Sequence, residues 1–141
     1  MLRHMRVLLD TNFLMIPSEF GIDIFSELER IITGKAEPCV LEGSIGELKR
    51  LASGIGKKSR AAALALKLVE KKGLRILRTA KLFKAEAYHP TSTVDDMILA
   101  LAERGNLVVA TQDKELKRRL KALDVPIVVM RQKSYLAFDE N

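Results

Sequence analysis

The chain has 141 residues, 48% of them hydrophobic, so it can bury one core but is too short for two large domains. Lys and Arg number 24 against 18 Asp and Glu, and the resulting charge of +6 favours an anionic partner such as nucleic acid. A single Cys, Cys39, excludes an internal disulfide or zinc ribbon and predicts a reducing, cytoplasmic setting, and no apolar run suits a signal peptide or a membrane helix.

Strands and helices are predicted to alternate along the chain. Strands are expected at about 6–10, 37–41, 74–77, 107–111 and 125–130, and helices over 21–33, 44–53, 57–73, 92–105 and 113–124. Residues 79–91 are expected to form a loop, and roughly the last eight residues an irregular tail. Because strands joined through helices pair in parallel, the expected fold is a single α/β domain, a three-layer α/β/α sandwich with a central parallel sheet of about five strands.

Four acidic residues lie where a predicted strand ends or a predicted helix begins, namely Asp10, Glu47, Asp95 and Asp113. In a parallel sheet these turns lie along one edge, so the carboxylates would converge. Clustered carboxylates raise one another's pKa and are best stabilised by a cation. Oxygen ligands select hard cations such as Mg²⁺ or Mn²⁺. The pattern therefore predicts metal-assisted cleavage of phosphodiester bonds.

Each acid also has a simpler structural explanation. Glu47 and Asp95 could complete capping boxes that begin at Ser44 and Ser92, and Asp113 could cap the helix that follows it. The catalytic interpretation therefore depends on the shared location of all four side chains, next to the positive ends of helix dipoles.

Three further polar residues are candidates to support a metal site. Asp95 lies at the start of the apolar face of its predicted helix and is the better ligand. Asp96 lies on the face toward solvent and would support the ligands from outside. Asn12 and Thr111 each lie two residues from a candidate ligand. Both could orient a carboxylate or a water molecule, or act only as turn residues.

Basic residues gather in two stretches, one after the glycines at 54 and 56 and one on the helix after Asp113. Such runs are often no more than solvated helix faces, yet the second begins at the expected active edge. The candidate RNA contacts are Lys57, Lys58, Arg60, Lys114, Lys117, Arg118 and Arg119.

The four acids stand in the contexts LLDTNFL, ELKRL, VDDMILALA and VVATQDKELKRRL, which resemble the motifs of PIN-domain nucleases. The resemblance runs from Val7 to about Tyr135, and DTNF, VDDMIL and ATQDKELKRRLK are similar to the small-subunit processome type that matures ribosomal RNA. It implies that one or two Mg²⁺ or Mn²⁺ ions are held by the four acids, with Thr111 at the family's hydroxyl position. It also implies an endoribonuclease acting on ribosomal precursor RNA, with protein partners or a homodimer.

Two alternatives remain open. A VapC-type toxin would be the same enzyme paired with an antitoxin, although VapC toxins usually carry a small residue after the third acid, where this chain has Asp96. A non-catalytic RNA-binding module would keep the basic residues while the acids served as helix caps.

Overall fold

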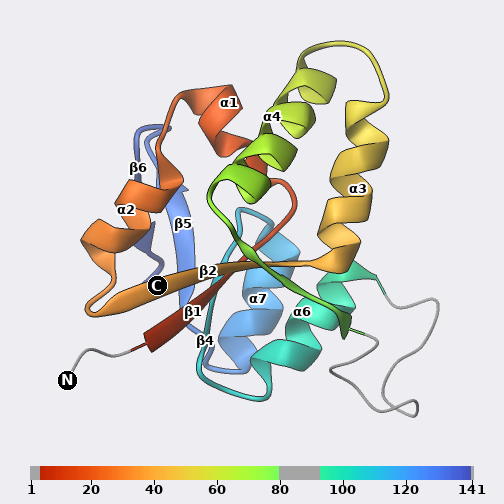
Figure 1. Cartoon of the computed structure of the whole chain (residues 1–141). Helices are drawn as coiled ribbons and strands as arrows, with labels where there is room; N and C mark the ends of the chain where they lie inside the picture. Colours follow the sequence, from red (N-terminus) through yellow and green to blue (C-terminus); the bar gives the residue numbers. More distant parts are fainter. Residues whose placement is uncertain (1–3, 80–92, 141) are drawn as a thin grey trace.

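The computed structural model describes residues 4–79 and 93–140, and in this part of the chain one sheet lies between two helical layers (Figure 1). The sheet order is β3-β2-β1-β4-β5-β6, parallel except for β6. The strands are β1 (His4–Leu9), β2 (Lys35–Leu41), β3 (Arg75–Leu77), β4 (Leu107–Ala110), β5 (Ile127–Arg131) and β6 (Tyr135–Phe138). The helices are η1 (Phe13–Met15), α1 (Ile16–Phe20), α2 (Ile24–Ile31), α3 (Glu42–Ala52), α4 (Lys57–Lys71), α6 (Val94–Ala102) and α7 (Lys114–Ala122).

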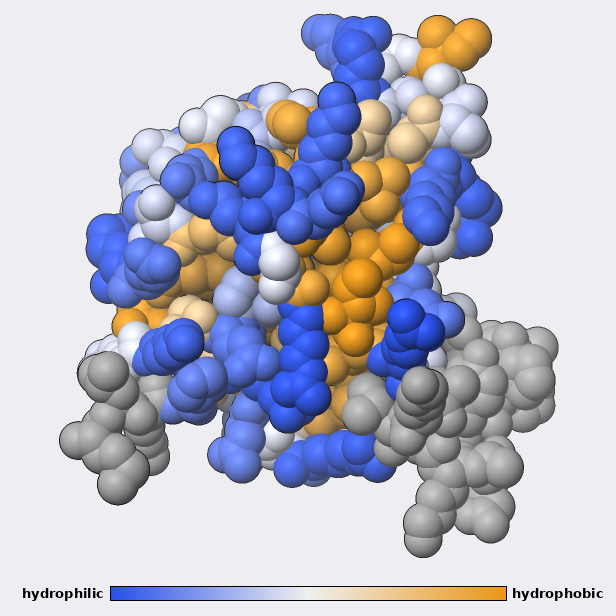
Figure 2. All heavy atoms as spheres, in the orientation of Figure 1, coloured by the Kyte–Doolittle hydropathy of each residue, from blue (hydrophilic) through white to orange (hydrophobic). Residues whose placement is uncertain are grey.

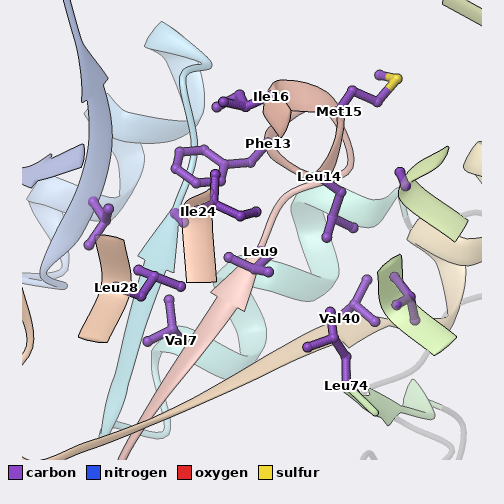
Figure 3. Close-up of a cluster of buried hydrophobic side chains, with 14 of the residues drawn as sticks. Val7, Leu9, Phe13, Leu14, Met15, Ile16, Ile24, Leu28, Val40 and Leu74 are labelled. Atoms are coloured by element: carbon purple, nitrogen blue, oxygen red, sulfur yellow. The ribbon is translucent and has the colours of Figure 1, made fainter. Parts of the chain in front are cut away.

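The predicted three-layer α/β/α architecture is confirmed, and β1 shows how it arises. Val7 and Leu9 point to one face of the sheet and Leu8 to the other, and all three are fully buried. The first face packs against η1 and helices α1 to α4, and Figure 3 shows its cluster around the end of β1, with Phe13 and Ile24 near Leu9. The second face packs against α6 and α7. A strand covered on both faces needs an unbroken apolar run, as the sequence has here.

The surface follows the same division between core and solvent. Figure 2 shows hydrophilic side chains over most of the face that it presents, with a band of hydrophobic surface between them. Partly buried apolar residues that pack against the first core include Ile45 and Leu51 of α3 and Leu66 of α4. Among the described residues, no helix has the length and apolar character needed to cross a bilayer.

The expected irregular tail is wrong, because Tyr135–Phe138 form a sixth strand, β6, antiparallel to β5. The turn between them places Gln132 and Lys133 both at φ 52°, and Ser134 N donates to Arg131 O over 3.0 Å. Two successive positive φ angles match the tight turn whose twist suits a hairpin, which usually contains Asn or Gly. Since neither residue is present, the sequence carries no hairpin signal there, and the sheet has one strand more than predicted.

The chain between β1 and β2 also differs from the expected helix over 21–33. No element was predicted between residues 11 and 20, but η1 and α1 lie there, and α1 ends at Gly21, whose φ is 68°. Helix α2 begins only at Ile24, where the Asp23 side chain accepts hydrogen bonds from the backbone N–H groups of Phe25 and Ser26. Asp23 is therefore the N-cap that the apolar periodicity alone did not reveal.

The cysteine lies on β2, between β1 and the edge strand β3. Cys39 of β2 is fully buried against α6 and α7, and burial raises the pKa of its thiol to about 12. The loop expected at 79–91 falls, from residue 80 on, outside the described residues.

Candidate active site

The site lies where the order of the strands reverses. The chain runs outward from β1 to β2 and β3, then returns to place β4 on the other side of β1. Asp10 directly follows β1, and its backbone N–H donates to Ala110 O at the end of β4 over 3.0 Å. Asp113 follows β4, so these two acids leave adjacent parallel strands. Ligand sites of open α/β sheets lie at such a reversal.

All four predicted acids line one cavity of about 550 Å³. Asp10 and Asp113 come from the strand ends, Glu47 from α3 and Asp95 from the first turn of α6. The structure thus brings together side chains that are far apart in the sequence. The described residues that line it are Asp10, Thr11, Asn12, Glu47, Arg50, Leu51, Lys58, Thr93, Val94, Asp95 and Asp113.

Asp10 is fixed from two sides. Its Oδ1 accepts a hydrogen bond from Thr11 N over 2.8 Å, and its Oδ2 accepts one from Thr111 Oγ1 over 2.9 Å. The Thr111 hydroxyl is fully buried and also accepts from Asp113 N over 3.1 Å. A carboxylate has about four acceptor sites, so both oxygens of Asp10 keep a lone pair for a further ligand. Thr111 therefore holds Asp10 and the turn carrying Asp113 in one arrangement.

Glu47 is held by Thr11, a residue that the sequence analysis did not single out. Thr11 Oγ1 donates to Glu47 Oε1 over 2.8 Å, and the Thr11 and Ser44 hydroxyls are 2.9 Å apart. Because a hydroxyl has one proton, Ser44 must donate to Thr11 while Thr11 donates to Glu47. The only signal in the sequence is that Thr11 directly follows Asp10 in a buried turn.

The expected capping box of Ser44 and Glu47 is wrong. Helix α3 begins at Glu42, immediately after Leu41 at the end of β2, so Ser44 lies inside the first turn and is fully buried. Glu47 is one turn further along the helix and is not at its N-terminus. Its carboxylate is therefore not used in a cap and turns to the cavity.

The capping box expected for Ser92 and Asp95 is shifted by one residue. Thr93 is the N-cap of α6, its hydroxyl accepts from Asp96 N over 3.1 Å, and the Asp96 carboxylate accepts from Thr93 N over 3.1 Å. Asp96 is exposed, caps the helix and does not line the cavity. Since Asp96 serves as the cap, Asp95 is left to face the cavity.

Asp113 serves as a helix cap as well as a cavity residue. Its Oδ1 accepts from Leu116 N over 2.7 Å, so it is the N-cap of α7, as the simpler explanation predicted. The cap and the cavity position of Asp113 are compatible because a carboxylate has two oxygens.

Asn12 also lines the cavity, and its side chain makes no capping hydrogen bond to η1.

The carboxylates repel one another. Burial raises the pKa of the Asp10 carboxyl, the hydrogen bonds from Thr111 and Thr11 lower it, and the charges of Asp113 and Glu47 raise it again. Burial likewise raises the pKa of Asp95, and the charges of the other three acids add to the rise. Arg119 opposes this effect on Asp95. A cation in the cavity would relieve the repulsion.

The donor set fits a hard divalent cation, because the acids supply only oxygen ligands around one cavity. In residues 4–79 and 93–140, however, no group of three Asp, Glu, His or Cys side chains is close enough together to hold one metal ion. Holding an ion would therefore require the side chains to move closer together, against the repulsion that the ion itself removes.

Of the predicted RNA contacts, Lys58 lines the cavity. Lys117 lies 3.9 Å from Asp139 Oδ2, and Arg118 pairs with Glu115. Arg50 also lines the cavity and was not predicted, since an Arg on an exposed helix face has no distinguishing pattern. The others, which do not line the cavity, are Lys57, Arg60, Lys114 and Arg119.

Residues 7–133 match the family model described as a PIN like domain. The chain belongs to the PIN-like domain family. It is 35% identical over 131 residues to Ribonuclease VapC4 of Methanocaldococcus jannaschii, a match covering 92% of this chain and 93% of that protein. It is 25% identical over 131 residues to the rRNA-processing protein FCF1 homolog of Mus musculus, of whose length the match spans 59%.

Solved structures agree with this family. The PIN domain endonuclease Utp24 superposes with a TM-score of 0.77 at 25% identity, covering 96% of this chain and 92% of that one. VapBC-1 from nontypeable Haemophilus influenzae superposes with a TM-score of 0.57 at 17% identity, covering 87% and 96%, and shares the fold.

Proposed function

We propose that this PIN-like domain is a divalent-metal-dependent endoribonuclease that hydrolyses phosphodiester bonds of RNA. The observation that carries the proposal is the single cavity lined by Asp10, Glu47, Asp95 and Asp113 at the reversal of the strand order. Relatives named a ribonuclease and a PIN domain endonuclease support it.

The four carboxylates would hold one or two Mg²⁺ or Mn²⁺ ions. Of the four, Asp10 and Asp95 would be stabilised most in their charged form, because the ion relieves their repulsion. Ions bound there would supply Lewis-acid stabilisation of the phosphate and an activated water molecule. Thr111 and Thr11 keep Asp10 and Glu47 oriented, and Asn12 at the cavity wall is placed to orient substrate or water.

For the biological role, we propose maturation of ribosomal precursor RNA in the cytoplasm, with protein partners or a second copy of the chain. The 25% identity over 131 residues to the FCF1 homolog, named an rRNA-processing protein, favours this role. A toxin ribonuclease controlled by an antitoxin is the alternative, and the 35% identity to VapC4 over nearly the whole of both proteins favours it. An antitoxin-sized reading frame directly upstream would decide for the toxin.

The test is cleavage of structured ribosomal RNA fragments with and without Mn²⁺, comparing the parent with Asp10→Asn. The parent is expected to cut only with the ion, and Asp10→Asn is expected to lose cleavage because one ligand charge is gone. Asp124→Asn is the matched control, since Asp124 is exposed, away from the cavity, and at φ 56°, where Asn is well tolerated. If Asp10→Asn cuts as well as Asp124→Asn, the proposed mechanism is wrong.

A further inference from the structure

We propose that a single RNA strand reaches the acidic cavity along its α3–α4 side, where Arg50 and Lys58 bind the phosphates next to the one that is cut. This inference rests on the proposed function and adds the path of the substrate. It also separates the basic residues that bind RNA from those that stabilise the fold.

A cavity lined by four carboxylates repels an RNA backbone, so cations must hold the flanking phosphates. Among the described residues, two basic side chains share the cavity wall with the acids, Arg50 of α3 and Lys58 in the first turn of α4. Arg50 Nη1 lies 3.7 Å from where a Cβ on Gly46 would stand, so the side chain leans back along α3 toward the turn that carries Glu47.

The two cations lie on neighbouring helices and are free to bind. Helices α3 and α4 pack side by side in an antiparallel pair (Figure 1). Arg50 and Lys58 are exposed, and neither forms a salt bridge with another described residue. Together they form a short positive edge on one side of the cavity.

Two basic residues of α7, Lys117 and Lys121, are engaged differently. The Asp139 carboxylate, only 4% exposed, lies 3.2 Å from Lys121 Nζ, 3.9 Å from Lys117 Nζ and 3.3 Å from Arg131 Nη2. These contacts fasten α7 and β5 to the segment after β6. Lys117 and Lys121 therefore help to neutralise a buried carboxylate, and withdrawing them to bind phosphate would weaken that neutralisation.

The experiment measures binding of a fluorescein-labelled single-stranded oligouridylate by anisotropy across a range of salt concentrations. The Asp10→Asn protein with millimolar Mg²⁺ is used throughout, so that cleavage does not interfere. The test variant adds Arg50→Gln and Lys58→Gln. The matched control adds Lys49→Gln and Lys67→Gln, one exposed cation from each of the same helices and outside the cavity lining.

We expect the test variant to reduce the slope of log affinity against log salt by about 1.4, since each phosphate contact on a single strand contributes about 0.7. The loss of both contacts corresponds to about 25-fold weaker binding at 0.1 M salt. The control and a Lys117→Gln variant should keep the parental slope. An unchanged slope in the test variant, or an equal fall in the control, overturns the proposal.

Cleavage by the protein with Asp10 intact is measured separately, so the two proposals can fail independently. Loss of slope without any parental cleavage would support the RNA path and refute the nuclease. Parental cleavage with an unchanged slope would do the reverse.

Discussion

Replacing Thr111 with Val tests whether the hydroxyl between two of the acids stabilises the site. Thr111 is fully buried, donates to Asp10 Oδ2 and accepts from Asp113 N. Valine has nearly the same shape but no hydroxyl, so Thr111→Val removes both hydrogen bonds without opening a cavity.

The size of the effect follows from the two partners. Losing a hydrogen bond to a largely buried carboxylate costs about 1.5–3 kcal/mol, and the more exposed Asp113 N–H adds about 0.5–1 kcal/mol. The expected destabilisation is therefore about 2–4 kcal/mol, which lowers the Tm of a domain of this size by roughly 6–12 °C.

Urea and thermal unfolding of metal-free protein measure this loss, with Thr111→Ser as the control. Serine keeps the hydroxyl and loses one methyl group, so it should cost only about 1 kcal/mol. If the Val and Ser variants differ by less than about 0.5 kcal/mol, within the additivity error of such data, the hydroxyl does not hold the site in the way described.

Three further results are expected. Millimolar Mg²⁺ or Mn²⁺ should raise the Tm of the parent, because an ion at ten times its Kd adds about 1.4 kcal/mol to the free energy of unfolding. The absence of any shift in Tm would contradict a metal site. Without divalent ions, the raised pKa values of Asp10 and Asp95 mean that these two carboxyls bind protons more tightly in the folded state, so their contribution to stability should fall as the pH rises from about 4 toward neutrality. Asp95→Asn should remove its share of that contribution in Tm measurements across pH, and a pH dependence identical to that of the parent would show that the repulsion is not felt. Thr11→Val should lower the cleavage rate far more than Thr11→Ser, because only Val releases Glu47, and equal rates would refute this role.

Much of the fold could be predicted because buried parallel strands have a simple sequence pattern, a short unbroken run of apolar residues. The runs Val7–Leu9 and Val108–Ala110 are unbroken apolar segments, each followed by polar residues, and both are central strands. Strand β6 could not be predicted in this way, because its turn uses Gln132 and Lys133 at angles that those residues rarely adopt. Strand β6 pairs with β5 and contacts α2, and the contacts with α2 join residues far apart in the sequence.

The four carboxylates could be placed at one edge of the sheet because each stands close to the end of a predicted strand or the start of a predicted helix. Their local roles could not, because a cap depends on where the helix starts to within one residue. The shift from Ser92 to Thr93 changes which of Asp95 and Asp96 completes the capping box. The bond from Thr11 to Glu47 spans 36 residues, and no spacing rule in the sequence indicates it.

The state of Cys39 has a practical consequence for measurement. Thiol reagents attack the thiolate, and a buried thiol with a pKa of about 12 offers almost none at neutral pH. It is the single cysteine of the chain, so a cysteine introduced at an exposed position such as Lys49 or Lys67 would react alone with a maleimide dye. Fluorescent labels could then report on either helix without first removing the native sulfur from the core.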